Sequence, residues 1–274
     1  MPAASRRPGT DTTSAGSLKS RLFFARRGTQ TLLLIIRKVA KHVLITGFEP
    51  FGGEKVNPSE LVARSLEGRL IAERLVVSCV LPVETRNLRD RLERALLEES
   101  PDIVLCMGQG GGRTAVALER VAVNVLDFER PDNVGVVRRQ EQIQRAGPDA
   151  RLSNLPFEKI VEAWHENGVP GYVSNSAGTF ICNHALYELL GLVEATASAI
   201  VAGFVHLPYL PAQAITAGSE STASMSFETM KRAMEILLET IVPWVDHHPL
   251  ERDVSTRARS SEMWIPRGVK EVER

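Results

Sequence analysis

The sequence predicts an α/β fold in which helices cover both faces of a mostly parallel sheet. Short apolar segments alternate with segments of helical periodicity, and several of the apolar segments stop at a glycine or a proline. Strands that are buried on both faces have continuous apolar runs of this kind. With 43% hydrophobic residues, the 274-residue chain can bury one large core, so we expect a single domain over residues 42–248.

The first half of this domain contains three predicted strands and two predicted helices. Residues 42–46 are apolar and stop at Gly47, which is typical of a buried strand that enters a loop. Apolar residues at intervals of three and four indicate the helices. In chain order the elements are strand 42–46, helix 58–66, strand 71–81, helix 88–97 and strand 103–107.

The second half continues the alternation of strands and helices. Gly191 follows an apolar helical pattern and predicts a helix end there. After Pro249 the charges are mixed in sign and no period persists, so we expect a frayed tail over residues 249–274. The predicted elements are strand 121–125, helix 157–164, strand 172–174, helix 182–190, strand 199–205 and helix 223–244.

Charge separates the N-terminus from the rest of the chain. Residues 1–41 contain nine Lys or Arg and one acid, Asp11, whereas residues 42–274 contain 24 basic and 32 acidic residues. We expect residues 1–41 to be a disordered basic extension without a catalytic role; a transit peptide or an upstream start also fits this composition. The acidic excess of the domain argues against a nucleic-acid partner, because phosphate contacts need clustered Lys and Arg.

Cysteine content and hydropathy favour a cytoplasmic protein without a structural metal or a membrane anchor. Cys79, Cys106 and Cys182 are too few and too irregularly spaced for a disulfide framework or a zinc site. The longest apolar run near the N-terminus, residues 32–36, is shorter than the roughly 7–15 residues of a signal-peptide core and the roughly 20 of a membrane span. We therefore expect no export signal.

Four polar or glycine-rich segments follow predicted strands. Ligands of open α/β sheets bind where strands end in loops, so these segments are the candidates for chemistry. They are residues 46–53 (TGFEPFGG), 108–113 (GQGGGR), 174–184 (SNSAGTFICNH) and 203–209 (GFVHLPY).

Cys182 is the candidate nucleophile. It lies at or just inside the start of a predicted helix, where free backbone N–H groups and the helix dipole favour a thiolate and can hold an oxyanion. A buried structural cysteine is the alternative interpretation. Cys79 within a strand and Cys106 near a strand end are interpreted as structural.

His206 is the candidate base. It directly follows an apolar strand, and Pro208 turns the chain out of the sheet, so the imidazole can reach a neighbouring loop. The alternative is a hydrogen-bonded structural histidine. His184 is the rival base, but two residues along a helix it points away from Cys182.

Glu119 is the candidate carboxylate that orients the histidine. It lies in a segment built otherwise of Ala and Val, where a buried acid is costly unless it is paired. His206 is one expected partner, which would complete a triad of nucleophile, base and carboxylate. A local ion pair with Arg113 or Arg120 is the alternative.

The glycine-rich loop and the first loop suggest a small pocket. Residues 108–113 lack the Gly-Lys-Ser/Thr ending of a phosphate-binding loop, and a Gly-x-Gly-x-x-Ala pattern from Gly110 is followed by strand-like alternation, not by a helix. Phe48 and Phe51 flank a proline in the first loop. They can form the wall of a small flat pocket or simply anchor the loop.

Together these segments resemble the pyrrolidone-carboxylate peptidase family, also called pyroglutamyl peptidase I. The similarity extends over about residues 42–213, and its separate blocks follow the family's order. Any one block is weak, but jointly they are specific. The strongest are residues 46–53, 57–59, 111–113, 119–122, 131–133, 174–183 and 203–211.

The resemblance implies a cysteine peptidase that removes an N-terminal pyroglutamyl residue from peptides without a metal or a cofactor. The nucleophile would be Cys182, the base His206 and the orienting carboxylate Glu119. The implied fold is a three-layer α/β/α sandwich of the phosphorylase/hydrolase-like type, usually assembled as a homotetramer. The implied substrate pocket contains Phe48, Phe51, Gln109 and Phe180.

One residue departs from the family pattern within the pocket region. Arg130 precedes residues 131–133, where the family often has an apolar pocket residue, so the pocket rim and the substrate preference stay open. An amidase or deamidase for another small cyclic or glutamine-like amide is therefore an alternative. A phosphorylase-like enzyme would need a phosphate site rich in Arg and Ser. A non-catalytic binding protein on this scaffold would be expected to lack one of the three triad residues.

Overall fold

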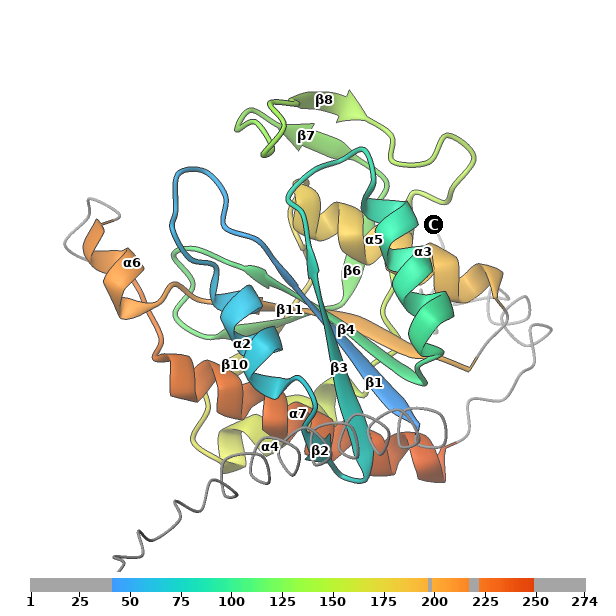
Figure 1. The fold of residues 1–274 in the computed structure, drawn as a ribbon, viewed down its shortest axis with the longest axis vertical. Helices are drawn as coiled ribbons and strands as arrows, with labels where there is room; N and C mark the ends of the chain where they lie inside the picture. The colour runs from blue at the N-terminus through green and yellow to red at the C-terminus, as the bar shows by residue number, and fades with distance from the viewer. Residues whose placement is uncertain (1–40, 197–198, 217–221, 249–274) are drawn as a thin grey trace, which may run out of the picture. The chain divides into compact units, whose positions relative to one another are not determined.

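The computed structural model describes residues 41–196, 199–216 and 222–248 (Figure 1). The predicted tail 249–274 and the predicted extension, apart from Lys41, lie outside the described residues. Within the described part, no helix is both long enough and apolar enough to cross a membrane.

A seven-stranded sheet forms the centre of the fold. Its middle strands β11, β4, β1 and β3 run parallel to one another, while β5 pairs antiparallel with β11, and β2 antiparallel with β3. The expected mostly parallel sheet is therefore confirmed. In spatial order the strands are β10 (Gly171–Ser174), β5 (Val116–Glu119), β11 (Val201–Leu207), β4 (Ile103–Gln109), β1 (His42–Phe48), β3 (Arg74–Leu81) and β2 (Leu70–Ile71).

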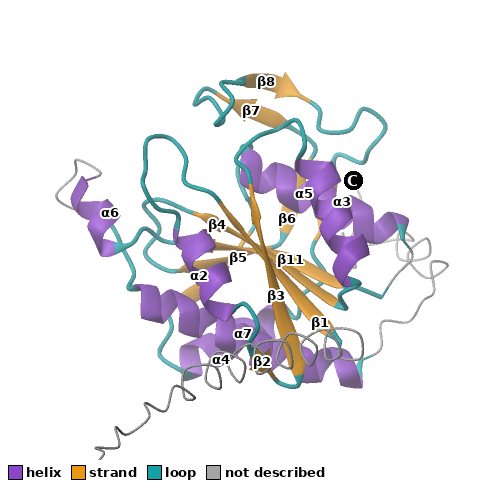
Figure 2. Cartoon of the chain, in the orientation of Figure 1, coloured by secondary structure: helices purple, strands orange, loops and turns teal. Residues whose placement is uncertain are grey.

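Helices cover both faces of this sheet, as predicted. Figure 2 shows α3 (Leu88–Glu99) and α5 (Ile181–Ala195) on one side, and α2 (Pro58–Leu66), α4 (Phe157–Glu166) and α7 (Phe227–His247) on the other. Each side has its own cluster of buried apolar side chains, because strands point successive residues to opposite faces. The two clusters and the sheet between them make the three expected layers.

The remaining elements lie outside the central layers. A short helix, α6 (Pro211–Thr216), follows β11. Two small antiparallel pairs interrupt the chain between β5 and α4. They are β6 (Val121–Val123) with β9 (Ala150–Leu152), and β7 (Leu126–Phe128) with β8 (Arg138–Glu141). Of these four strands only β6 overlaps a predicted strand.

Two predicted strands have different limits in the structure. The predicted strand 71–81 is broken because Ala72 and Glu73 have positive φ angles of 45° and 66°, which reverse the chain between β2 and β3. The predicted strand 121–125 is shorter in the structure, Val121–Val123, and lies outside the central sheet. The continuous buried run Val116–Glu119 enters the sheet, whereas Val121–Val123 alternates in burial and pairs only with β9.

Two predicted helices also have different ends. The helix expected to close at Gly191 continues to Ala195, because Gly191 is a packing position: a Cβ there would lie 3.2 Å from the Arg151 guanidinium carbon. The last helix begins at Phe227 instead of residue 223. Ser226 caps it by accepting a hydrogen bond from the Thr229 backbone N–H at 3.1 Å.

Candidate active site

Strand β11 places His206 on the face of the sheet that α5 covers. Alternation along the strand puts His206 on the same face as Phe204, which packs in the apolar cluster with α3 and α5. Across the sheet, His206 pairs in register with Gly108 of β4. The histidine is buried, with 4% of its surface exposed. Its ring therefore faces the start of α5, not solvent.

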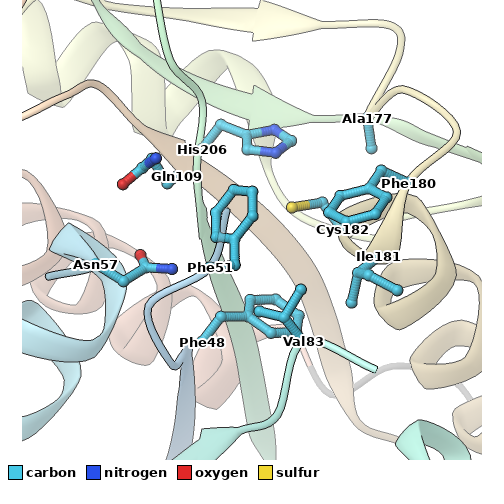
Figure 3. A pocket seen from close by; sticks show the side chains of 10 residues that line it. All are labelled: Phe48, Phe51, Asn57, Val83, Gln109, Ala177, Phe180, Ile181, Cys182 and His206. Carbon is cyan, nitrogen blue, oxygen red and sulfur yellow. The ribbon is translucent and has the colours of Figure 1, made fainter. Parts of the chain in front are cut away.

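Cys182, the second residue of α5, approaches the same point from above the sheet. A Cβ built on Gly108 would lie only 2.7 Å from Cys182 Sγ, so the sulfur rests directly over the sheet neighbour of His206. Both side chains line one cavity, and in Figure 3 the Cys182 sulfur is drawn below the His206 ring. The absence of a side chain at Gly108 makes this approach possible.

Hydrogen bonds from Asn183 hold the first turn of α5 in place, while the N-terminus of the helix has no side-chain cap. Asn183 Oδ1 accepts a hydrogen bond from Val123 N–H at 2.9 Å, and its Nδ2 donates to the Val123 and Val125 carbonyls at 2.9 and 3.1 Å. The N-cap residue Phe180 has no side-chain oxygen and makes no capping bond. Backbone N–H groups of the first turn therefore stay available to an anion. The sequence analysis did not identify Asn183.

Glu119, at the end of β5, is fully buried, and one of its carboxylate oxygens lies close to two partners, the imidazole of His206 and the guanidinium of Arg113. Its Oε1 lies 2.7 Å from His206 Nδ1 and 3.1 Å from Arg113 Nη1. The β5–β11 register explains the first contact, because Glu119 pairs with Phe204 and is thus a diagonal neighbour of His206. Of the two arginines considered as alternative partners of Glu119, Arg113 contacts the carboxylate in addition to His206. Arg120 instead lies over the Phe157 ring, with its guanidinium carbon 5.2 Å from the ring centroid.

Burial shifts the pKa values of Cys182 and His206 in the directions that favour their neutral forms. Burial raises the pKa of Cys182 to about 12, and the negative charge of Glu119 adds to that effect, while Arg113 opposes it. Burial lowers the pKa of His206, with Arg113 acting in the same sense and Glu119 opposing both. Burial therefore acts against the thiolate that the helix start was expected to favour.

His184, the rival base, lies elsewhere. Its Nε2 is 3.8 Å from Glu188 Oε1 on the next turn of α5, and it does not line the cavity. Cys106 is fully buried in the core, and burial raises its pKa to about 12. Cys79, Cys106 and Cys182 are all free thiols. Only Cys182 among them borders the cavity.

The cavity beside Cys182 has a volume of about 140 Å³. That is close to the roughly 150 Å³ of a protein cavity that holds a single benzene ring. All four predicted pocket residues border it, together with Asn57, Val83, Ala177 and Ile181, which the sequence analysis did not propose for the pocket. Its lining is apolar except for two amides and the reactive pair (Figure 3).

The two amides, Asn57 and Gln109, are held by their neighbours. Asn57 caps α2 by accepting from Ser59 N–H at 3.0 Å, and its Nδ2 donates to the Glu49 carbonyl at 3.1 Å. Gln109 Oε1 accepts from Gln213 Nε2 at 2.8 Å. The Gln109 amide nitrogen is therefore oriented away from Gln213 and can donate to a ligand.

Phe48 lies deeper than the sequence predicted. It is the last residue of β1 rather than a loop residue, and only 2% of its surface is exposed. Phe51 is half-buried in the loop that follows, and its ring centroid lies 5.9 Å from that of Phe180. Phe48 thus forms the floor of the cavity, while Phe51 and Phe180 form two aromatic walls.

Replacement of Gly108 by alanine should impair catalysis more than folding. The new methyl would lie 2.7 Å from Cys182 Sγ and 2.8 Å from Phe204 Cζ, so the thiol must move from His206. We expect kcat/KM to fall at least about tenfold, and the free energy of unfolding to fall by about 1–3 kcal/mol. Gly203→Ala is the control, since its methyl would meet Leu155 on the opposite face. Equal specific activity of the two folded variants would contradict this role of Gly108.

Among the described residues, no group of three or more His, Cys, Asp or Glu side chains is placed to hold a metal ion. The site itself offers a thiol and an imidazole that border one cavity beside a helix start, and a buried carboxylate that accepts a hydrogen bond from the imidazole. These are the functional groups of a thiol-dependent hydrolase, a class of enzyme in which a cysteine attacks a carbonyl group and forms an acyl-enzyme intermediate.

Comparison with known proteins identifies the family. The family model for pyroglutamyl peptidase matches residues 41–243. A pyrrolidone-carboxylate peptidase from Pyrococcus furiosus is 40% identical over 206 residues, covering 73% of this chain and 99% of the relative. The Bacillus subtilis pyrrolidone-carboxylate peptidase is 40% identical over 200 residues, covering 73% and 92%. The solved pyroglutamyl peptidase I of Bacillus amyloliquefaciens aligns with a TM-score of 0.70 at 38% identity, covering 73% and 96%.

The chain therefore belongs to the pyroglutamyl peptidase family and is a cysteine peptidase. The resemblance seen in the sequence is confirmed. The amidase, phosphorylase-like and non-catalytic alternatives are not favoured by these relatives.

Proposed function

We propose that the protein hydrolyses the amide bond after an N-terminal pyroglutamyl residue, with Cys182 as nucleophile, His206 as base and Glu119 as the orienting carboxylate. The observation that supports this best is the order of contacts at the cavity. Glu119 bonds His206, His206 and Cys182 border one cavity, and that cavity is the size of a single ring.

Acylation begins with a proton transfer from Cys182 Sγ to His206 Nε2. The sulfur attacks the carbonyl carbon of the pyroglutamyl residue, and the carbonyl oxygen becomes an anion that the uncapped N–H groups of α5 can bind. His206 then donates the proton to the leaving amine as the C–N bond breaks. The shortened peptide leaves, and a thioester joins the pyroglutamyl group to Cys182.

Deacylation repeats the same proton transfers with water. His206 Nε2 accepts a proton from a water molecule, whose oxygen attacks the thioester carbonyl. Collapse of the second tetrahedral intermediate breaks the C–S bond, and the sulfur takes the proton back from His206. Free pyroglutamate and the neutral thiol result, so the resting pair is restored.

Glu119 keeps the imidazole in the tautomer that these steps need. Its Oε1 accepts from His206 Nδ1–H at 2.7 Å, so the unprotonated Nε2 is the atom left for the thiol. The same carboxylate stabilises the imidazolium that forms during attack. Arg113, at 3.1 Å from Oε1, compensates the buried negative charge.

The cavity suits the pyroglutamyl ring. A five-membered lactam is flat and mostly apolar, so it can pack against the aromatic rings of Phe48, Phe51 and Phe180 that line the cavity. Its N–H and C=O require polar partners when they are buried, and Asn57 and Gln109 are the side-chain amides in the lining. A prolyl residue has the ring but no lactam carbonyl, and it carries a charged nitrogen that this lining does not pair.

The test compares a chromogenic pyroglutamyl amide with the matching prolyl amide. We expect turnover of the first only, at a kcat/KM at least about a hundredfold higher, because the prolyl group leaves the pocket amides unsatisfied. Treatment with a thiol alkylator should abolish the activity, and prior binding of a pyroglutamyl aldehyde should protect Cys182 from it. Cleavage of both amides at similar rates would rule out the proposed specificity.

Two finer properties stay predictions. The resemblance to the family predicts a homotetramer, which light scattering on the purified protein would measure. The free state of Cys79, Cys106 and Cys182 is compatible with the predicted cytoplasmic location. Fractionation of the source cells would test that location directly.

A further inference from the structure

One short segment, residues 127–133, contacts both aromatic walls of the cavity from behind. Phe128 packs edge-on against Phe180, with ring centroids 4.7 Å apart and an interplanar angle of 82°. Two residues later, the guanidinium carbon of Arg130 lies 5.3 Å from the centroid of Phe51. Neither Phe128 nor Arg130 borders the cavity itself. The segment thus supports the walls without lining the pocket, and we refer to it as the brace.

Arg130 holds the Phe51 loop through two different contacts. Its guanidinium lies against the Phe51 ring, and Nη2 donates a hydrogen bond to the Gly52 carbonyl at 2.8 Å. Gly52 has a φ of +63°, and a Cβ there would lie 2.0 Å from Nη2, so glycine is needed for this approach. The ring and the following peptide group are therefore fixed together by one planar side chain.

The brace is itself anchored to the rest of the domain. Asn133 Nδ2 donates to the Pro50 carbonyl at 2.9 Å and to Glu49 Oε1 at 2.8 Å, so the loop is held on both sides of Phe51. Asp132, almost fully buried, accepts from the backbone N–H of Thr85 at 3.0 Å and of Val136 at 2.8 Å. Because the brace is anchored in this way, it can determine where the loop with Phe51 lies, although that loop contains two glycines with positive φ, Gly52 and Gly53.

We propose that Arg130 is a positioning residue that sets the spacing between Phe51 and Phe180 and thereby the affinity for the pyroglutamyl ring. This inference rests on the proposed function, because it assigns the cavity that both rings border to the lactam. Phe180 is supported by buried Phe128, whereas the guanidinium that lies against the Phe51 ring belongs to an exposed residue, Arg130. Loss of Arg130 should therefore loosen one wall only and leave the thiol–imidazole pair in place.

The experiment compares Arg130→Met with Arg130→Lys and a matched control. Methionine has a side chain of similar length but loses both the contact with the Phe51 ring and the hydrogen bond to the Gly52 carbonyl. Lysine keeps the positive charge but lacks the planar guanidinium group. Arg139→Met is the control, because Arg139 pairs with exposed Glu129 and contacts neither wall. For a neutral pyroglutamyl amide we expect Arg130→Met to raise KM about five- to twentyfold and to change kcat less than about twofold. Lysine should restore the affinity only in part.

The free lactam pyrrolidone separates wall positioning from direct contact with the substrate. It carries no carboxylate, so Arg130 cannot attract it by charge, and its inhibition constant should rise in parallel with KM in Arg130→Met. A KM increase confined to peptides with an acidic second residue would overturn the proposal and make Arg130 a substrate contact. Unchanged KM and inhibition constant would also overturn it.

A double-mutant comparison tests the contact with the loop. Gly52→Ala should displace Arg130 and raise KM, and in the Arg130→Met background it should add little. Fully additive effects would contradict the proposal. An inactive wild-type protein would refute the proposed function instead, so the two failures are distinguishable.

Discussion

Replacement of Cys182 by alanine should abolish peptidase activity while the protein stays folded. The variant loses the only free thiol that borders the cavity, and no other described side chain of the lining can form a thioester. We expect kcat/KM to fall at least about ten-thousandfold, the scale seen when the nucleophile of a triad is removed. His206→Ala should cause a loss of similar order, because the neutral thiol with a pKa of about 12 cannot ionise without a base.

The two losses should not add. If Cys182 and His206 act as one unit, the double variant should be no less active than either single variant. Cys106→Ala is the matched control, since that thiol is fully buried in the core and does not border the cavity. It should lose some stability and keep its kcat. Measurable activity in Cys182→Ala, or additive losses in the double variant, would contradict the proposed mechanism.

Local patterns predicted where the main side chains lie along the fold. Cys182 at a helix start and His206 at a strand end follow from periodicity and from the turn residues near them. Glu119 was singled out because an acid in an apolar segment needs a partner. Each of these observations uses only a few neighbouring residues, which is the range over which sequence patterns are informative.

Features that depend on the pairing of distant strands were not predictable in this way. The reversed direction of β5 creates the diagonal contact of Glu119 with His206, and nothing within residues 116–119 indicates that direction. Gly108 matters because α5 crosses above it, and Asn183 because residues 123–125 return beside it. These contacts appear only once the whole sheet is assembled.

The second large effect concerns the charges around His206. His206 faces Glu119 from β5, Arg113 from the glycine loop and the Cys182 thiol from α5, while Phe204 beside it carries no charge. Burial holds the pKa of His206 below its usual value of 6.5, so its neutral, active form should persist to lower pH than for an exposed histidine. The acidic limb of kcat/KM in the wild type should therefore lie below pH 6.5.

Opposite shifts of this limb should follow from removal of the two charges. Glu119 raises the pKa of His206, so Glu119→Gln should move the acidic limb to still lower pH, with a fall in kcat/KM of about a hundredfold or more from the weaker hold on the imidazole. Arg113 lowers that pKa, so Arg113→Met should move the limb to higher pH. Tyr172→Phe, which removes only the hydroxyl that Arg113 contacts at 2.9 Å, should leave the limb in place.

The pH dependence of kcat/KM, measured for all four proteins at constant ionic strength, decides between electrostatic and merely structural roles. A carboxylate that only filled space could be replaced by its isosteric amide without any shift of the limb. An arginine that only tied the glycine loop to β10 would lower activity equally at every pH. Shifts in the same direction for Glu119→Gln and Arg113→Met would be incompatible with one oxygen shared between the imidazole and the guanidinium. In that case Glu119 would have to act on His206 independently of Arg113.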